Sequence, residues 1–77
     1  MMTTELLIPR LEMSMTEGDL IEWLVEDGAT VKEGDPIYTI EMAKATQDIT
    51  APVSGTLKQI AAKGQTYDVG TLIGEIS

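Results

Sequence analysis

Hydrophobic and polar residues alternate in short runs along this chain, and glycine or proline turns separate most of the runs. Runs of this length, rich in Ile, Leu, Val, Thr and Tyr, are typical of β-strands bounded by turns. The pattern predicts six strands, at residues 5–8, 19–25, 36–40, 46–50, 56–62 and 71–76. Helical spacing is sustained nowhere; residues 57–62 are the single ambiguous run. We therefore expect an all-β sandwich or barrel.

The chain also repeats itself, because residues 18–40 align with residues 55–76. The glycines match in pairs: Gly18 with Gly55, Gly28 with Gly64, and Gly34 with Gly70. Glycine marks places where the backbone reverses or needs positive φ, so matching glycines indicate matching structural turns. The sequence predicts two similar halves, joined near residues 41–54 and related by quasi-twofold symmetry.

Alternation within residues 19–25 assigns side chains to the faces of one strand. Ile21, Trp23 and Val25 share one face, and Leu20 and Leu24 share the other. A lone aromatic residue in a strand is usually a core residue rather than a platform for a ligand. We assign the aromatic residues to the core on this basis: Trp23, Tyr38 and Tyr67.

The composition of the chain excludes several classes of function. The chain has 77 residues, which we interpret as one domain (residues 1–77), and a formal net charge of −8. This charge argues against binding to nucleic acid or to an anionic membrane, and permits either a basic protein partner or solubility alone. Cys and His are absent, which excludes disulfides, thiolate–zinc sites and imidazole bases. We expect no catalytic residues, no metal site and no enzymatic activity.

The acidic residues at the turns lack the regular Asp spacing of a calcium loop, so we interpret them as a solvated surface. They are Glu26, Asp27, Glu33 and Asp35. No apolar run is long enough to span a bilayer, and the first residues do not resemble a signal peptide. A cytoplasmic location is expected, or the mitochondrial matrix if the protein is eukaryotic, with the isolated domain a monomer.

Lys44 lies in the segment EMAKAT, between the two halves, where we expect a turn. One interpretation is an ordinary edge cation, since lysines at turns and sheet edges discourage strand pairing. The other is a handle for a covalently attached group, because the long side chain of lysine carries its amine away from the sheet. The residues alone favour the simpler interpretation.

The segment IPRLEMSMTEGDLIEWLVEDGATVKEGDPIYTIEMAKATQDITAPVSGTL resembles the lipoyl/biotinyl attachment domain family, and the resemblance extends over nearly the whole chain. The resemblance implies a flattened β-barrel, or sandwich, of two antiparallel sheets with quasi-twofold symmetry. It also implies that the attachment lysine, which is Lys44 here, lies at a hairpin tip. The segment 51–55, APVSG, is family-like as well.

The residues beside Lys44 favour lipoate over biotin. Biotinyl domains typically have Met on both sides of the lysine, whereas here Ala43 and Ala45 occupy those positions. Lipoyl domains typically read Glu-Thr-Asp-Lys-Ala, and this chain keeps Glu41 and Ala45 but has Met42 and Ala43 in the middle. Glu41 corresponds to a glutamate that helps lipoylating enzymes select the lysine.

Residues 13–18, which include Met15 and Glu17, resemble lipoyl domains of pyruvate- or acetoin-type acyltransferases. The resemblance therefore assigns recognition by the ligase or other partners to six residues: Glu41, Met42, Ala43, Ala45, Met15 and Glu17.

The resemblance implies a swinging-arm carrier domain with lipoate joined to Lys44 by an amide bond. Its partners would be a lipoate ligase or lipoyl transferase, a thiamine-diphosphate-dependent dehydrogenase component, an acyltransferase core and a dihydrolipoyl dehydrogenase. Two alternatives remain: a biotinyl carrier domain of a carboxylase or decarboxylase, and an unmodified, lipoyl-like interaction module. The sequence fits either a small carrier or a domain of a larger acyltransferase.

Overall fold

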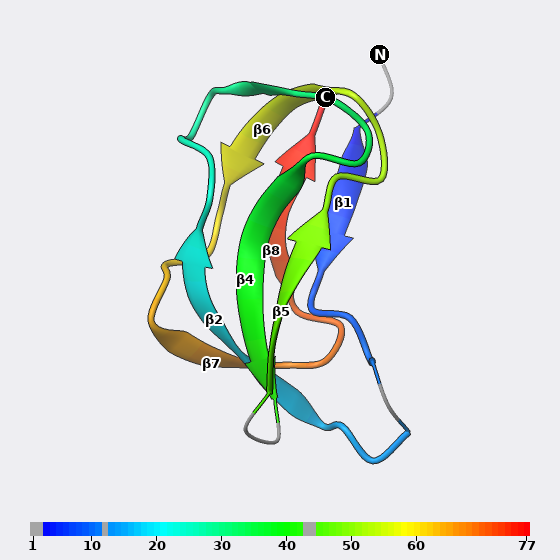
Figure 1. The fold of residues 1–77 in the computed structure, drawn as a ribbon, viewed down its shortest axis with the longest axis vertical. Helices are drawn as coiled ribbons and strands as arrows, with labels where there is room; N and C mark the ends of the chain where they lie inside the picture. The colour runs from blue at the N-terminus through cyan, green and yellow to red at the C-terminus, as the bar shows by residue number, and fades with distance from the viewer. Residues whose placement is uncertain (1–2, 12, 43–44) are drawn as a thin grey trace.

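The computed structural model describes residues 3–11, 13–42 and 45–77, and within these ranges the chain forms eight β-strands (Figure 1). They are β1 (Thr4–Leu7), β2 (Glu17–Trp23), β3 (Thr30–Val31), β4 (Pro36–Met42), β5 (Ala45–Thr50), β6 (Gly55–Gln59), β7 (Gln65–Asp68) and β8 (Leu72–Ile76). None of the described residues forms a helix that could cross a membrane. The predicted all-β class is confirmed.

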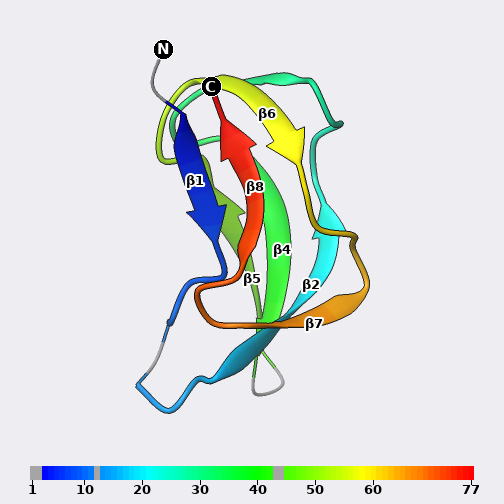
Figure 2. The ribbon, with the colours of Figure 1, turned by 180° about the vertical axis from the view of Figure 1, so that it is seen from behind.

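Two four-stranded antiparallel sheets lie face to face, as the two opposite views show (Figures 1 and 2). One sheet has the order β1-β8-β6-β3, and the other has the order β5-β4-β2-β7. The internal repeat pairs β6 with β2 and β8 with β4, so the second order is the first one with each strand replaced by its counterpart. This correspondence gives the quasi-twofold symmetry that the matched glycines predict.

The core lies between the inner faces of the two sheets. Its members are buried apolar side chains: Leu6, Ile8, Met15, Leu20, Val31, Ile37, Tyr38, Ile40, Ala51, Leu57, Ile73 and Ile76. No described polar or charged residue is buried with them. Tyr38 belongs to the core as predicted, and Trp23 and Tyr67 pack against it while partly exposed. Both halves of the repeat thus contribute side chains to one continuous core.

Two strands escaped the sequence analysis, and one predicted strand is shorter than expected. β3 has two residues and β7 has four, which is too short for alternation to stand out from the neighbouring turns. The run predicted at residues 56–62 ends as a strand at Gln59. Beyond it, the backbone N–H groups of both Ile60 and Ala61 donate to the carbonyl of Ile73, so regular pairing stops there.

The predicted faces of β2 are wrong, because a bulge interrupts the strand. The pairing of β2 with β4 shifts register between Leu20 and Glu22. Leu20 is fully buried, whereas Ile21 and Leu24 are exposed. Trp23 therefore packs on the same side of the sheet as Leu20, since the extra residue reverses the alternation.

The matched glycines serve two different purposes. The four turn glycines, Gly28, Gly34, Gly64 and Gly70, have φ angles between +78° and +93°, and Gly55 has φ +157°. The other pair, Gly18 and Gly55, was also predicted to lie in turns, and this prediction is wrong. Gly18 lies in β2 and Gly55 lies in β6. A Cβ atom at Gly18 would be 2.7 Å from Cδ1 of Ile40, and one at Gly55 would be 2.8 Å from Cγ2 of Ile76. Close approach to equivalent isoleucines therefore explains this pair.

Candidate functional site

The hairpin of β4 and β5 carries the predicted attachment residue. The pairing of these strands runs up to Met42 opposite Ala45, so two residues connect them. These two, Ala43 and Lys44, lie outside the described residues. Figure 1 shows the paired ends of β4 and β5 at one end of the long axis, whereas β1 begins and β8 ends at the other.

The sequence of β4 explains why this hairpin projects from a firm base. β4 lies between β5 and β2, so both of its edges are paired. Ile37, Tyr38 and Ile40 are buried, while Glu41 and Met42 at its end are half-buried. A strand anchored by buried side chains along most of its length holds its last residues in a fixed position.

The described recognition residues fall into exposed and inward-facing groups. Ala45 and Glu17 are exposed, and Glu41 is half-buried. Met42 packs against the core, while Ala43 lies outside the described residues. Recognition itself remains a prediction for all of them.

Met15 is a core residue, with 5% of its surface exposed. Its sulfur accepts a hydrogen bond from the backbone N–H of Leu11 at 3.4 Å, and its Cε would be 2.9 Å from a Cβ atom at Gly18. A side chain in this position touches no partner directly. Any part it has in recognition must come from holding the segment between β1 and β2.

The structure adds two carboxylates to the residues beside the hairpin. Glu41 lies between Asp19 of β2 and Thr46 of β5 in one row across the sheet. Two residues back along β4, on the same face, the hydroxyl of Thr39 donates to Oδ1 of Asp48 at 2.9 Å. Asp19 and Asp48 were not predicted as site residues, because strand register alone brings them near Glu41. The available signal was the alternation of Glu17 with Asp19 in one run and of the polar residues Thr46, Asp48 and Thr50 in the other.

The outer face of this sheet is acidic. Glu17 stands opposite Asp68, Asp19 accepts a hydrogen bond from the hydroxyl of Thr66, and Glu22 is exposed. None of the four strands β5, β4, β2 and β7 contains Lys or Arg. A positively charged partner would therefore be attracted to this face, and attraction of this kind is screened by salt.

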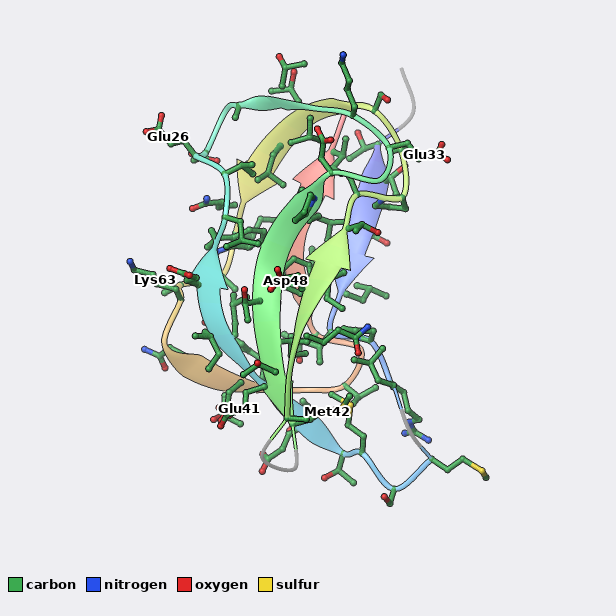
Figure 3. The ribbon with its side chains drawn as sticks, viewed as in Figure 1. Glu26, Glu33, Glu41, Met42, Asp48 and Lys63 are labelled. Carbon is green, nitrogen blue, oxygen red and sulfur yellow. The ribbon has the colours of Figure 1, made fainter. Side chains whose placement is uncertain are left out.

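A cleft on the side of the molecule lies apart from the hairpin. Its lining includes Trp23, Leu24, Gln59 and Lys63. Nε1 of Trp23 donates to the carbonyl of Ala61 at 3.1 Å, and Nε2 of Gln59 donates to the carbonyl of Val25 at 2.9 Å. These hydrogen bonds tie equivalent connections of the two halves together, so we interpret the cleft as structural. Figure 3 shows Lys63 away from Glu41 and Met42.

The described acidic residues do not form a metal site. Within residues 3–11, 13–42 and 45–77, no three carboxylates gather in a group that could hold a metal ion. Glu33 and Asp35 serve the turn before β4 instead: Oδ2 of Asp35 accepts from the N–H of Lys32, and the N–H of Glu33 donates to the hydroxyl of Ser54.

Two pseudo-symmetric sheets and a lysine between two paired strands are features of an attachment domain. Comparison with known families agrees, since residues 4–76 match the biotin/lipoyl family described as "Biotin-requiring enzyme". The chain belongs to this family.

Several curated proteins similar to this chain are acyltransferase components of multienzyme systems. The chain is 37% identical over 76 residues to a dihydrolipoyllysine-residue succinyltransferase component of the 2-oxoglutarate dehydrogenase complex from Bartonella vinsonii, covering 97% of this chain and 18% of the relative. It is 35% identical to the acetyltransferase component of the acetoin cleaving system of Pseudomonas putida, covering 92% and 20%. It is 42% identical to the acetyltransferase component of the pyruvate dehydrogenase complex of Rickettsia bellii, covering 94% and 18%. The chain thus spans about a fifth of the length of these relatives.

Proposed function

We propose that this chain is a lipoyl carrier domain, modified on Lys44. The observation that carries the proposal is the β4–β5 register, which leaves only Ala43 and Lys44 between the paired residues Met42 and Ala45. An acceptor amine in so short a connection is tethered to the firm end of a hairpin. The names of the relatives, which contain dihydrolipoyllysine, favour lipoate over biotin.

The described surroundings fit a group attached through an amide. Ala45 and Thr46, which follow Lys44, are exposed and small or short, and Met42 turns inward to the core. An enzyme can therefore approach along β5 without displacing a large side chain. Glu41, half-buried in the row beside Asp19, presents its carboxylate from β4 at the same end.

The chain's own contribution is position rather than catalysis. Lipoate supplies the acyl-carrying and electron-carrying chemistry when it is bound. Lys44 provides the amine that forms the amide, and this step removes one positive charge from the protein. The two sheets hold the hairpin, and tethering raises the effective concentration of the carried group at each partner's active site.

The proposed partners follow from the complexes named for the relatives. They are a lipoate ligase or lipoyl transferase, a thiamine-diphosphate-dependent dehydrogenase component, an acyltransferase core and a dihydrolipoyl dehydrogenase. The relatives come from 2-oxoglutarate, pyruvate and acetoin systems, so the proposal concerns 2-oxo acid and acetoin dehydrogenase complexes as a class. A cytoplasmic or mitochondrial matrix location is part of the same proposal.

Intact mass after coexpression with a lipoate ligase tests the proposed modification. We expect the mass of one lipoyl group to be added to the wild-type chain and none to be added to Lys44→Arg, which keeps the charge but removes the acceptor amine. Lys58→Arg, in β6, is the matched control and should be modified like the wild type. An unmodified wild-type chain, or a lipoyl mass that persists in Lys44→Arg, would refute the proposal. Streptavidin blotting after treatment with a biotin ligase tests the biotinyl alternative.

A further inference from the structure

The four edge strands of this molecule differ in a way that singles out β5. β3 has two residues, β1 and β7 have four each, and β5 has six. The pairing of β1 shifts register between Leu6 and Leu7. The pairing of β5 with β4 also shifts once, opposite Ile49 and Thr50, but it is regular over the five residues from Ile49 to Ala45. Short or bulged edges resist pairing with other chains, and so do edges that carry lysine or proline. β5 contains neither residue.

Two hydrogen bonds at the open end of the hairpin, where β4 begins and β5 ends, show which backbone groups of β5 point away from β4. Leu24 N–H donates to the carbonyl of Ile37 at 2.8 Å, and Ala51 N–H donates to the carbonyl of Asp35 at 2.8 Å. The N–H and C=O groups of one residue point to the same side of a strand, and those of the next residue point to the other side. Both hydrogen bonds therefore lead to the same assignment. The residues of β5 whose backbone groups point away from β4 are Thr46, Asp48 and Thr50.

These outward groups form an open pairing edge beside Lys44. Among the described residues, none makes a hydrogen bond to the backbone N–H or C=O of Thr46, Asp48 or Thr50. All three residues are exposed. A row of unpaired backbone groups on a regular strand is a template for adding an extended segment of another chain.

The side chains along this edge indicate what such a segment should carry. Asp48 lies on the outer face with its carboxylate held by the hydroxyl of Thr39, and Glu41 lies on the same face, two residues along β4 from Thr39. Figure 3 shows both side chains on the β4–β5 side of the molecule. A residue paired directly opposite Asp48 would lie within about 5 Å of it. A lysine or arginine is favoured at that position.

The position of β5 also distinguishes Lys44 from the other lysines. Lys58 lies in β6, which is paired on both sides by β8 and β3. Lys32 precedes β4, which is also paired on both sides, and Lys63 precedes the four-residue edge β7. Among the lysines, Lys44 alone is followed directly by a six-residue edge strand, so an enzyme that pairs with this strand brings the correct lysine to its active site.

We propose that β5 is a docking edge on which an extended segment of the lipoylating enzyme pairs with the backbone of Thr46 and Asp48, with a basic side chain opposite Asp48. The inference rests on the proposed modification of Lys44 and names the feature by which the ligase recognises it.

Proline substitution at outward-facing positions tests the docking edge. Asp48→Pro removes an N–H that β4 does not use, so the hairpin ladder keeps its bonds. The matched control is Glu5→Pro in β1. Ile60 N–H donates to the carbonyl of Ile73, so Glu75 also points toward β6, and Glu5, paired with Glu75, points outward. We expect kcat/KM for lipoylation by a lipoate ligase to fall at least tenfold in Asp48→Pro and to change less than twofold in Glu5→Pro. Equal rates for wild type and folded Asp48→Pro would overturn the proposal.

Amide exchange in the wild-type chain gives a second answer that does not depend on a variant folding. With saturating ligase and no lipoate, exchange of the Thr46 and Asp48 amides should slow at least tenfold. The amides of Gln47 and Ile49, which face β4, should be protected with or without the ligase. Unchanged exchange at Thr46 and Asp48 would refute docking along β5, provided that the same ligase preparation modifies the chain once lipoate is added.

Asp48→Asn separates the charge from the backbone. This variant keeps the N–H and an acceptor for Thr39, so we expect a two- to fivefold lower kcat/KM at low ionic strength and a smaller difference at high salt. Absence of any difference at low salt would overturn the basic side chain opposite Asp48. A wild-type chain that is never lipoylated contradicts the proposed function instead, so the two failures are distinguishable.

Discussion

Tyr38 is the residue at which burial and chemistry are most closely coupled. It is 2% exposed, and its ring packs edge-to-face with Trp23, with 5.5 Å between the centroids. Burial raises the pKa of Tyr38 to about 12, because the phenolate would lose its hydration in the core. The folded protein therefore holds this phenol neutral to higher pH than the unfolded chain does.

This shift predicts a loss of stability at alkaline pH. The unfolded chain releases the Tyr38 proton near pH 10, before the folded chain does, so the stabilisation is complete below about pH 10 and is lost by about pH 12. The free energy of unfolding should fall by up to about 1.4 kcal/mol per pH unit within this window. Urea unfolding of the wild type and of Tyr38→Phe at several pH values measures it. A wild-type profile parallel to that of Tyr38→Phe would contradict the assignment.

At the scale of elements, equivalent turns in the two halves have the same backbone conformation. Gly34, between β3 and β4, has φ +93°, and its counterpart Gly70, between β7 and β8, has φ +89°. A Cβ atom at Gly34 would have no heavy atom within 4 Å. Any cost of a side chain there comes from the backbone conformation alone, since nothing nearby would clash with it.

Replacing Gly34 measures this backbone cost directly. Gly34→Val should lower the free energy of unfolding by about 1–2 kcal/mol, because a β-branched residue is strained at positive φ. Gly34→Asn should cost less, since Asn tolerates this region. Thermal melts of both variants, with Gly70→Val as the matched turn in the other half, provide the comparison. A Gly34→Val protein as stable as the wild type would contradict the matched-turn interpretation.

The strands show what the sequence could and could not predict. Alternation and glycine punctuation located six strands within a few residues, and the repeat predicted two similar halves related by quasi-twofold symmetry. Alternation failed at Ile21, where a bulge changes the phase of β2, and it missed β3, which exists because its partner β6 lies beside it. The same limit applies to the site. Lys44 was predicted from the family resemblance of its surroundings, whereas Asp19 and Asp48 come near Glu41 only through strand register.

The whole molecule carries an excess of negative charge, because acidic residues outnumber basic residues by 13 to 5. Its formal net charge is −8, and two carboxylates, Glu17 and Asp68, stand opposite each other on β2 and β7. Like charges directly opposite on paired strands are destabilising, and salt screens them.

We therefore expect the melting temperature to rise with ionic strength. Glu17→Gln should raise the melting temperature at low salt, and it should make the increase with salt smaller than in the wild type, because it relieves the repulsion from Asp68. Melting curves between about 0.01 M and 1 M sodium chloride test both statements, with Debye lengths of about 30 Å and 3 Å at these limits. A melting temperature that falls with salt would argue against self-repulsion.

The quasi-twofold symmetry relates the β4–β5 hairpin to the place where β8 pairs with β1, and there Ile76 stands opposite Thr4. The two places are equivalent in the fold, but β4 and β5 are consecutive in the chain, whereas β8 and β1 are not. The molecule measures 34 Å along its long axis, and these places lie at its two ends (Figure 1). A protein joined to the chain beyond Thr4 or Ile76 would therefore be held at the far pole, leaving β5 and the outer acidic face clear for a visiting enzyme.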